Sequence, residues 1–347
     1  MWGNAIIRRV NLRNEREVTA VRRFLEQFSL TFDAVIDYTV AVFKGETMVA
    51  TGSLAGEVLR NFAVDENYQG EGLTATVISE LMREAATRGI YHYFIYTRPA
   101  KAHLFTALGF TEIARAEPYA ALLESGMGSV DQYCREISRQ IQWLPQGNRA
   151  GIIMNANPFT RGHLALIRHA ASRHDIILFV VSEDRSLFPY EDRIRLIRDG
   201  VAELSNVAVV GGGKYIISAA TFPGYFTREE ETLTAQTRLD VTLFASRIAP
   251  ALGIGARYVG EEPYCGVTAT YNQAMADILP ACGITLHVMP RAAVEGDIIS
   301  ASKVRDAIRR DDWVQVQRMV PDTTLEYLRS LQAQPIIDRI KHSDSRH

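Results

Sequence analysis

Hydrophobic and polar positions follow two different spacings along the chain. Between residues 40 and 64, short apolar runs separated by glycine-containing turns predict consecutive strands. Residues 73–88 instead repeat apolar side chains every three or four positions, which predicts a helix with one buried face. A further strand is predicted at residues 91–97, and a short helix ends within residues 104–110. This part of the chain therefore predicts a unit that combines strands and helices.

After residue 150, strands and helices alternate regularly. The predicted strands are residues 151–158, 176–183, 207–213, 257–262 and 285–290, and the predicted helices lie around 164–171, 191–204, 239–253 and 270–279. Such alternation predicts a parallel, doubly wound sheet, in which ligands bind beyond the carboxyl ends of the strands. We therefore expect the chemistry in the loops that follow Met154, Val181, Val210, Val259 and Met289. The tail after Pro335 is expected to be frayed.

The change of spacing predicts two domains. Residues 130–143 read as a polar helix, and residues 144–148 contain the proline, glycine and asparagine of a linker. We place the domains at residues 1–145 and 146–347, and a length of 347 residues is consistent with two.

Composition excludes several classes of protein. A formal charge of −2 gives no basic surface for nucleic acid or an anionic membrane, and no apolar run is long enough to cross a bilayer. The N-terminus becomes charged within eight residues, unlike a secretory signal. Three dispersed cysteines without C-x-x-C spacing indicate neither a disulfide framework nor a zinc site. We expect a cytoplasmic protein with no nucleic-acid or membrane partner and no protein-held metal.

The segment NANPFTRGH, residues 155–163, links the first predicted strand of the second domain to its first helix. Thr160 can cap that helix, and Gly162 removes side-chain bulk where a ligand could approach the backbone. His163 then falls in the first helical turn, where unpaired N–H groups and the helix dipole favour anions. The alternative is a capped turn with a surface histidine.

A second segment of this kind, ISASKVRDAI, covers residues 299–308. Ser300 and Ser302 stand at a predicted helix start, and Arg305 follows one turn later. Hydroxyl groups, N–H groups and a guanidinium together suit a polyphosphate. The alternative here is an ordinary serine-capped helix.

The two segments resemble the HxGH and ISSTxxR signatures of the nucleotidylyltransferase superfamily, with Thr160 where many members have histidine. The resemblance implies a Rossmann-like domain that binds ATP as a substrate, with Mg²⁺ accompanying the phosphates. By this resemblance Thr160 and His163 would contact the α-phosphate, Asn157, Phe159 and Gly162 would line the nucleotide site, and Ser300, Ser302 and Arg305 would hold the leaving pyrophosphate.

Several longer sequence segments make the family resemblance more specific. NANPFTRGH, KYIISAATFPGYF, RYVGEEPYCGVTATYNQ and ISASKVR occur in this order, and together they resemble the citrate lyase ligase family over about residues 1–330. The family joins acetate to the thiol of a phosphoribosyl-dephospho-coenzyme A group on the citrate lyase acyl carrier subunit. This implies an acetyl-adenylate intermediate and the products AMP and pyrophosphate.

Other polar residues follow predicted strands or helix starts. Lys214 and Arg193 are candidate partners for phosphate or acetate, and we assign Lys214 a catalytic role. Each could equally be a solvated surface charge, and Arg193 could pair with a neighbouring carboxylate. Glu261 and Glu262 could bind ribose or be structural, and Cys265 is not expected to act as a nucleophile.

Residues 62–74, FAVDENYQGEGLT, resemble motif A of the GNAT acetyltransferases. The resemblance implies a mixed-sheet domain whose loop binds a coenzyme A pyrophosphate through Gln69, Gly70, Gly72, Leu73 and Thr74. Phe105 stands where that family places the tyrosine that protonates the thiolate, and Arg98 replaces an expected asparagine. Because phenylalanine has no proton to give, we expect this domain to hold the coenzyme A-like arm rather than to transfer acetyl groups.

Two other functions compete with an acid–thiol ligase. One is a nucleotidylyltransferase acting on a phosphorylated metabolite, fused to an acetyltransferase. The other is a non-catalytic adaptor for a carrier protein. The two intact phosphate segments argue against the adaptor, and Phe105 argues against the fused acetyltransferase.

Overall fold

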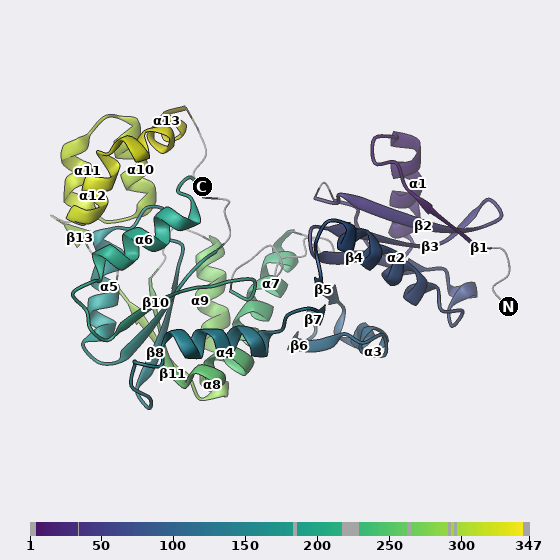
Figure 1. The fold of residues 1–347 in the computed structure, drawn as a ribbon, viewed down its shortest axis with the longest axis horizontal. Coiled ribbons are helices and arrows are strands. Elements are labelled where there is room, and N and C mark those ends of the chain that lie inside the picture. The colour runs from purple at the N-terminus through teal and green to yellow at the C-terminus, as the bar shows by residue number, and fades with distance from the viewer. Residues whose placement is uncertain are drawn as a thin grey trace. The chain divides into compact units, whose positions relative to one another are not determined.

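The computed structural model describes residues 5–33, 35–182, 186–216, 229–261, 266–290, 293–294 and 297–342 (Figure 1). Two compact units emerge, one of residues 1–129 with 220–242 and one of residues 130–219 with 243–347. Helix α4 (Val130–Gln140) belongs to the second unit because it packs on the π-helical turn η4 (Phe244–Ile248) and on α8 (Ala249–Leu252). The domain limits drawn from the sequence, 1–145 and 146–347, stay a prediction.

The first unit is built on a mixed sheet of seven strands in the order β1-β2-β3-β4-β5-β7-β6. The strands are β1 (Ala5–Arg9), β2 (Tyr38–Lys44), β3 (Thr47–Ala55), β4 (Val58–Val64), β5 (His92–Thr97), β6 (Thr111–Ala116) and β7 (Ala120–Gly126). Only the pair β4 and β5 is parallel, and it is joined through Val58 with Phe94 and Leu59 with Ile95, at the start of β4. Sequence spacing predicted β2 to β5 but gave no strand at β1, β6 or β7.

Helices of the first unit are α1 (Glu15–Glu26), α2 (Leu73–Thr87) and α3 (Ala102–Thr106), with short 3-10 turns η1 (Glu66–Tyr68) and η2 (Pro99–Lys101). The predicted face of α2 is buried, including Val77 and Leu81. Gly52 of β3 allows this contact, because a Cβ there would lie 2.4 Å from a methyl group of Val77. Helix α2 therefore sits directly on the sheet.

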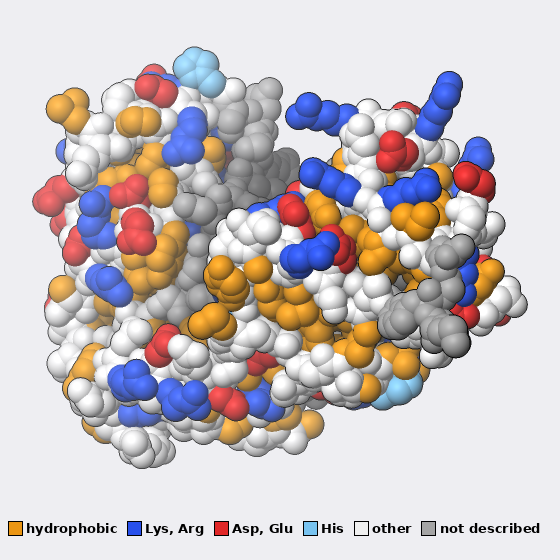
Figure 2. All heavy atoms as spheres, turned by 45° about the vertical axis from the view of Figure 1, so that its right-hand side comes forward, with side chains coloured by type: hydrophobic (Ala, Val, Ile, Leu, Met, Phe, Trp, Pro, Cys, Tyr) orange, Lys and Arg blue, Asp and Glu red, His pale blue; other side chains and the backbone are white. Residues whose placement is uncertain are grey.

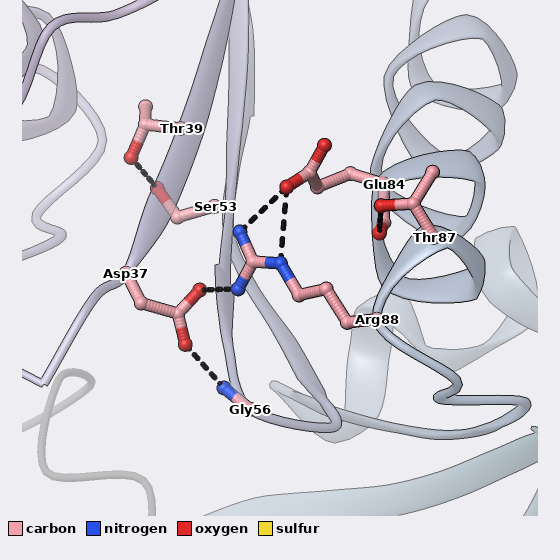
Figure 3. A network of polar contacts seen from close by, with 7 residues as sticks. All are labelled: Asp37, Thr39, Ser53, Gly56, Glu84, Thr87 and Arg88. Carbon is pink, nitrogen blue, oxygen red and sulfur yellow. Dashed lines mark hydrogen bonds and ion pairs between the residues drawn. The ribbon is translucent and has the colours of Figure 1, made fainter.

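The carboxyl end of α2 is fixed by a polar network (Figure 3). Arg88, which follows the helix, donates to Glu84 at 2.8 and 3.0 Å and to Asp37 at 2.6 Å. The other carboxylate oxygen of Asp37 accepts from the backbone of Gly56 in the β3–β4 turn at 2.8 Å. A cation also suits this end of the helix dipole. The network therefore ties the carboxyl end of α2 to the segment before β2 and to the β3–β4 turn.

The second unit contains a parallel five-stranded sheet in the order β10-β9-β8-β11-β12. Its strands are β8 (Arg149–Met154), β9 (Asp175–Val180), β10 (Val207–Gly211), β11 (Ile254–Gly260) and β12 (Thr285–Met289). Helices α5 (Arg161–Ala171), α6 (Tyr190–Gly200) and α9 (Gly266–Ile278) follow β8, β9 and β11. The strand order reverses at β8, so the loop after β8 lies where such sheets bind ligands. The predicted fold class, a mixed-sheet α/β unit followed by a parallel-sheet unit, is confirmed.

Between β10 and β11 runs a longer helical segment than the predicted 239–253. Helix α7 (Glu229–Leu243) continues through η4 and α8, and Gly253, at a φ of 67°, ends the run. A short turn η5 (Pro280–Cys282) precedes β12, and the hairpin of β13 (Ala293–Val294) and β14 (Asp297–Ile298) precedes the last helices.

The prediction of a frayed tail after Pro335 is wrong. The chain ends in α10 (Ala301–Arg309), α11 (Trp313–Met319), α12 (Asp322–Leu328), a turn η6 (Leu331–Ala333) and α13 (Gln334–His342). Ile336, Ile337 and Ile340 are buried, and α13 packs on α10. Proline is tolerated in a first helical turn, so Pro335 does not prevent this helix. The tail is therefore part of the support beneath α10.

No helix among the described residues is both long and apolar enough to cross a bilayer. On the face drawn in Figure 2, basic and acidic side chains are interspersed, in line with the formal charge of −2.

The packing of α13 predicts a stability effect. Ile340→Ala should lower the free energy of unfolding by about 2–5 kcal/mol, since it leaves a cavity at a fully buried position. Leu331→Ala is the control, because Leu331 is 92% exposed, and it should change stability by less than about 0.5 kcal/mol. Urea unfolding followed by tryptophan fluorescence measures both, and equal midpoints for the two variants would contradict the role given to α13.

Candidate phosphate-binding site

The loop between β8 and α5 is held in a constrained backbone shape. Ala156 has a φ of 51°, in the left-handed region, which costs a non-glycine residue about 1–2 kcal/mol. The neighbouring Asn155 is tied to Ser186, its side-chain amide donating to the Ser186 hydroxyl at 2.9 Å. Such a shape persists only where surrounding contacts over-determine it, and this is common at ligand sites.

Thr160 and His163 form a reciprocal cap at the start of α5. The backbone N–H of His163 donates to Thr160 Oγ1 at 3.3 Å, and the backbone N–H of Thr160 donates to His163 Nδ1 at 3.1 Å. Thr160 Oγ1 also lies 3.0 Å from Nδ1. Because Nδ1 accepts the backbone hydrogen bond, a neutral imidazole must carry its proton on Nε2. The cap therefore fixes the neutral tautomer in which Nε2 is a hydrogen-bond donor.

The plane of the His163 ring is set by Phe159. The two rings stack with centroids 5.9 Å apart and planes 11° from parallel. Phe159 is fully buried and packs closely on Gly200, where a Cβ would lie 2.5 Å from the ring. The buried side chain orients the His163 ring, and the predicted place of Phe159 in the nucleotide site stays a prediction.

Helix α10 begins beside the start of α5. Ser300 caps it, its hydroxyl accepting from the backbone of Lys303 at 3.2 Å and lying 3.0 Å from the Ser302 hydroxyl. A Cβ added at Gly162 in the first turn of α5 would lie 3.5 Å from the carbonyl oxygen of Ile299. The two helix starts predicted from the sequence are therefore adjacent in space.

A buried guanidinium joins the two helix starts. Arg305 of α10 is 5% exposed, and its Nη1 donates to the carbonyl oxygen of Asn157 at 2.5 Å. Burial lowers the pKa of Arg305 from its ordinary value, although an arginine of this kind stays cationic. The side chain of Asn157, also buried, accepts from the backbone of Phe188 at 3.1 Å. Whether either residue also contacts a ligand stays a prediction.

Arg193 does not occupy the surface position considered from the sequence. It is fully buried in α6, and its guanidinium donates to the carbonyl oxygens of Phe188, Asn155 and Val181 and to the side chain of Asn155, at 2.7–3.0 Å. Arg193 therefore supports the loops after β8 and β9, and its predicted contact with phosphate stays a prediction.

Lys214 lies at the same edge of the sheet. Lys214 follows the carboxyl end of β10, which is two strands from β8 in the sheet. Its side chain is exposed. Glu261 is exposed after β11, and its backbone N–H donates to the Met289 carbonyl at 2.8 Å. Glu262 and Cys265 lie outside the described residues. Among the described residues, no group of three or more histidine, cysteine, aspartate or glutamate side chains is placed to hold a metal ion.

In the first unit, the predicted arm-binding loop precedes α2. Gly70 and Gly72 have φ values of 84° and 77°, and Gly72 caps α2 without a side-chain hydrogen bond. Gln69 is exposed, Thr74 is half-buried and Leu73 is part of the core. The side chain of Leu73 therefore packs in the core and anchors the helix. Only the backbone N–H of Leu73 could take part in the predicted binding.

Lys44 braces this loop from the end of β2. Its ammonium group lies 2.6 Å from the Glu71 carboxylate and 4.3 Å from the centre of the Tyr68 ring. Phe105 is buried against Phe62, with ring centroids 5.3 Å apart, whereas Arg98 is exposed. The position that would carry a proton donor in an acetyltransferase is thus part of an apolar cluster.

The fold defines a class of two-unit α/β protein, with a mixed sheet in the first unit and a parallel sheet in the second, where two helix starts lie side by side. The family model of the citrate lyase ligase C-terminal domain matches residues 149–328. The chain belongs to the citrate lyase ligase family and is a ligase.

Named relatives match over nearly their whole length. The citrate (pro-3S)-lyase ligase of Klebsiella pneumoniae is 39% identical over 333 residues, covering 94% of this chain and 97% of that protein. The enzyme of the same name from Haemophilus influenzae is 40% identical, covering 90% and 96%. A solved structure, the ribosomal-protein-S18-alanine N-acetyltransferase of Escherichia coli, is 18% identical and covers 36% of this chain and 95% of that chain, with a TM-score of 0.30.

The placement of Arg193 predicts a structural phenotype. Arg193→Met should lower the free energy of unfolding by on the order of 3 kcal/mol, because it leaves several buried carbonyl groups without donors. Arg195→Met on the same helix is the control, since Arg195 pairs with Asp192 at the surface and should matter by less than about 1 kcal/mol. Chemical denaturation compares the two, and a fully stable Arg193→Met protein would show that Arg193 is not a support.

Proposed function

We propose that this protein uses ATP to join acetate to the thiol of the phosphoribosyl-dephospho-coenzyme A group on the acyl carrier subunit of citrate lyase. AMP and pyrophosphate are the other products, and the reaction activates citrate lyase. The observation that carries the proposal is the adjacency of the α5 and α10 starts, given by the contact between Gly162 and Ile299 and by the bond from Arg305 to Asn157. The near full-length likeness to citrate lyase ligases supports the choice of substrate.

The first step forms acetyl-adenylate. An acetate oxygen attacks the α-phosphorus of ATP, a P–O bond forms, and the bond to the β-phosphate oxygen breaks to release pyrophosphate. The Nε2–H of His163 donates to an α-phosphate oxygen, where negative charge grows in the transition state. This role is supported by the hydrogen bond from the Thr160 N–H to Nδ1, because it leaves the imidazole proton on Nε2.

The leaving pyrophosphate is held at the start of α10. Unpaired backbone N–H groups, the hydroxyls of Ser300 and Ser302 and the positive end of the helix dipole all favour a multiply charged anion. Lys214, from the exposed loop after β10, adds a positive charge on the same edge of the sheet. Mg²⁺ enters with ATP as part of the substrate, bound through the phosphates.

The second step transfers the acetyl group. The thiol of the arm loses its proton to solvent, and the thiolate attacks the acetyl carbon. A C–S bond forms as the C–O bond to AMP breaks. In this proposal, residues 69–72 and the start of α2, where Gly72 is a cap without a side-chain hydrogen bond, hold the pyrophosphate of the arm. Phe105 supports a binding role for the first unit, since an apolar cluster offers no acid.

Product analysis tests the proposal against its alternatives. Purified protein, ATP and deacetylated carrier should yield AMP and pyrophosphate only when acetate is added. A nucleotidylyltransferase would instead require a phosphorylated co-substrate and ignore acetate, and an adaptor would consume no ATP. The cytoplasmic location expected from the sequence is part of this proposal.

Replacing His163 tests the first step. His163→Gln should lower the rate of acetate-dependent ATP–pyrophosphate exchange by about 10²–10³-fold, the usual effect of removing one transition-state donor. Glutamine at this helix position still accepts from the capping residue, so the cap survives while the imidazole is lost. His169→Gln on the same helix is the control and should exchange normally. Exchange by His163→Gln within twofold of the parent protein would remove His163 from the mechanism.

Blocking the glycine loop tests the division of labour. Gly70→Arg should raise the KM for the carrier protein about tenfold, equivalent to about 1.4 kcal/mol, and leave acetate-dependent exchange unchanged. Gly56→Arg is the matched control, because both glycines have positive φ and open space around an added Cβ. An equal fall in exchange for Gly70→Arg would mean that the first unit does more than hold the arm.

A further inference from the structure

Tyrosine rings gather around the end of β10, outside both phosphate segments. Tyr133 of α4 donates from its hydroxyl to the carbonyl oxygen of Gly211 at 3.0 Å. Its ring lies 5.3 Å from that of Tyr215, centroid to centroid, at a tilt of 42°. A Cβ at Gly213 would be 3.1 Å from the same ring. Tyr133 therefore contacts residues on both sides of Lys214 in sequence.

The opposite side of this loop is also held. The backbone N–H of Gly213 donates to the Ser182 hydroxyl at 2.9 Å, and that of Gly212 donates to the Val180 carbonyl at 2.8 Å. Gly213 has a φ of 56°, which a residue with a side chain rarely adopts. The loop is thus clamped between the end of β9 and the Tyr133 ring, and Lys214 is the next residue.

The Tyr133 hydroxyl is suited to a permanent donor role. Burial raises its pKa well above the ordinary value, with smaller contributions from Cys134 and Tyr190. The hydroxyl is therefore protonated at neutral pH and can donate. The hydroxyl of Tyr190 approaches the same point, since it would lie 2.5 Å from a Cβ at Gly211.

We propose that Tyr133 is a positioning residue for Lys214. Its hydroxyl fixes the carbonyl of Gly211 and its ring supports Gly213 and Tyr215, so that the ammonium group of Lys214 is presented at the carboxyl edge of the parallel sheet. The inference rests on the proposed function in that Lys214 is taken to meet the phosphates of ATP. It adds that this role is set by helix α4, which precedes both phosphate segments in the sequence.

A double-mutant cycle tests the coupling. Tyr133→Phe should lower kcat for acetate-dependent exchange by about threefold to tenfold, the effect of losing one hydrogen bond, with KM for acetate unchanged. In a Lys214→Met background, Tyr133→Phe should have no further effect, since a residue that acts through Lys214 has nothing left to position. Multiplicative losses in the double variant would overturn the proposal.

Two further experiments distinguish a positioning role of Tyr133 from a general loss of structure. Asp131→Asn removes another contact of α4, the one with Arg247 at 3.0 Å, and should leave exchange unchanged. Acylation of Lys214 by an amine-reactive ester, followed by mass spectrometry, should be slowed by ATP in the parent protein and at least threefold less so in Tyr133→Phe. Equal protection in both proteins, or none in the parent, would overturn the proposal. If the parent protein shows no exchange at all, the proposed function fails, and the acylation arm still decides the role of Tyr133.

Discussion

Everything at the candidate site depends on the meeting of two helix starts at one edge of a parallel sheet. Each start carries N–H groups that have no partner inside its helix, and each is the positive end of a dipole. Alone, either is a common surface feature. Where they meet, at Gly162 and Ile299, the two positive helix ends add together, which favours an anion with several charges.

This meeting is maintained by buried arginines. Arg305 crosses from α10 to the carbonyl of Asn157, and Arg193 binds carbonyl oxygens of the loops after β8 and β9. A planar guanidinium with several fixed donors can hold more than one loop at once, which a lysine in the same place could not do. The strained backbone of Ala156 is consistent with this, because such a conformation needs rigid surroundings. At this edge of the sheet, these two charged side chains therefore have a structural role.

The spacing of apolar residues and the cap residues predicted those features that depend on residues close together in the sequence. The alternation of strands and helices after β8 gave the parallel sheet, and cap residues such as Thr160 and Ser300 marked the two helix starts. Strand β1 was missed because a short edge strand has no strong alternation, and α13 was missed because Pro335 reads as a helix stop when it is in fact a helix start. Arg193 was misplaced because burial of a charge depends on carbonyl groups from distant loops.

The two units share one structural feature, a helix that begins directly after a strand and a loop. Each presents a helix start after a strand, one capped by Gly72 and the other by Thr160, so each is suited to phosphate. The difference lies in what surrounds the start. In the second unit an oriented imidazole stands in the first helical turn, whereas in the first unit Phe105 is part of an apolar cluster. A unit that retains anion binding and lacks a proton donor can hold a substrate without reacting with it. In the proposed reaction, the first unit would hold the tethered thiol while the second unit activates the acid.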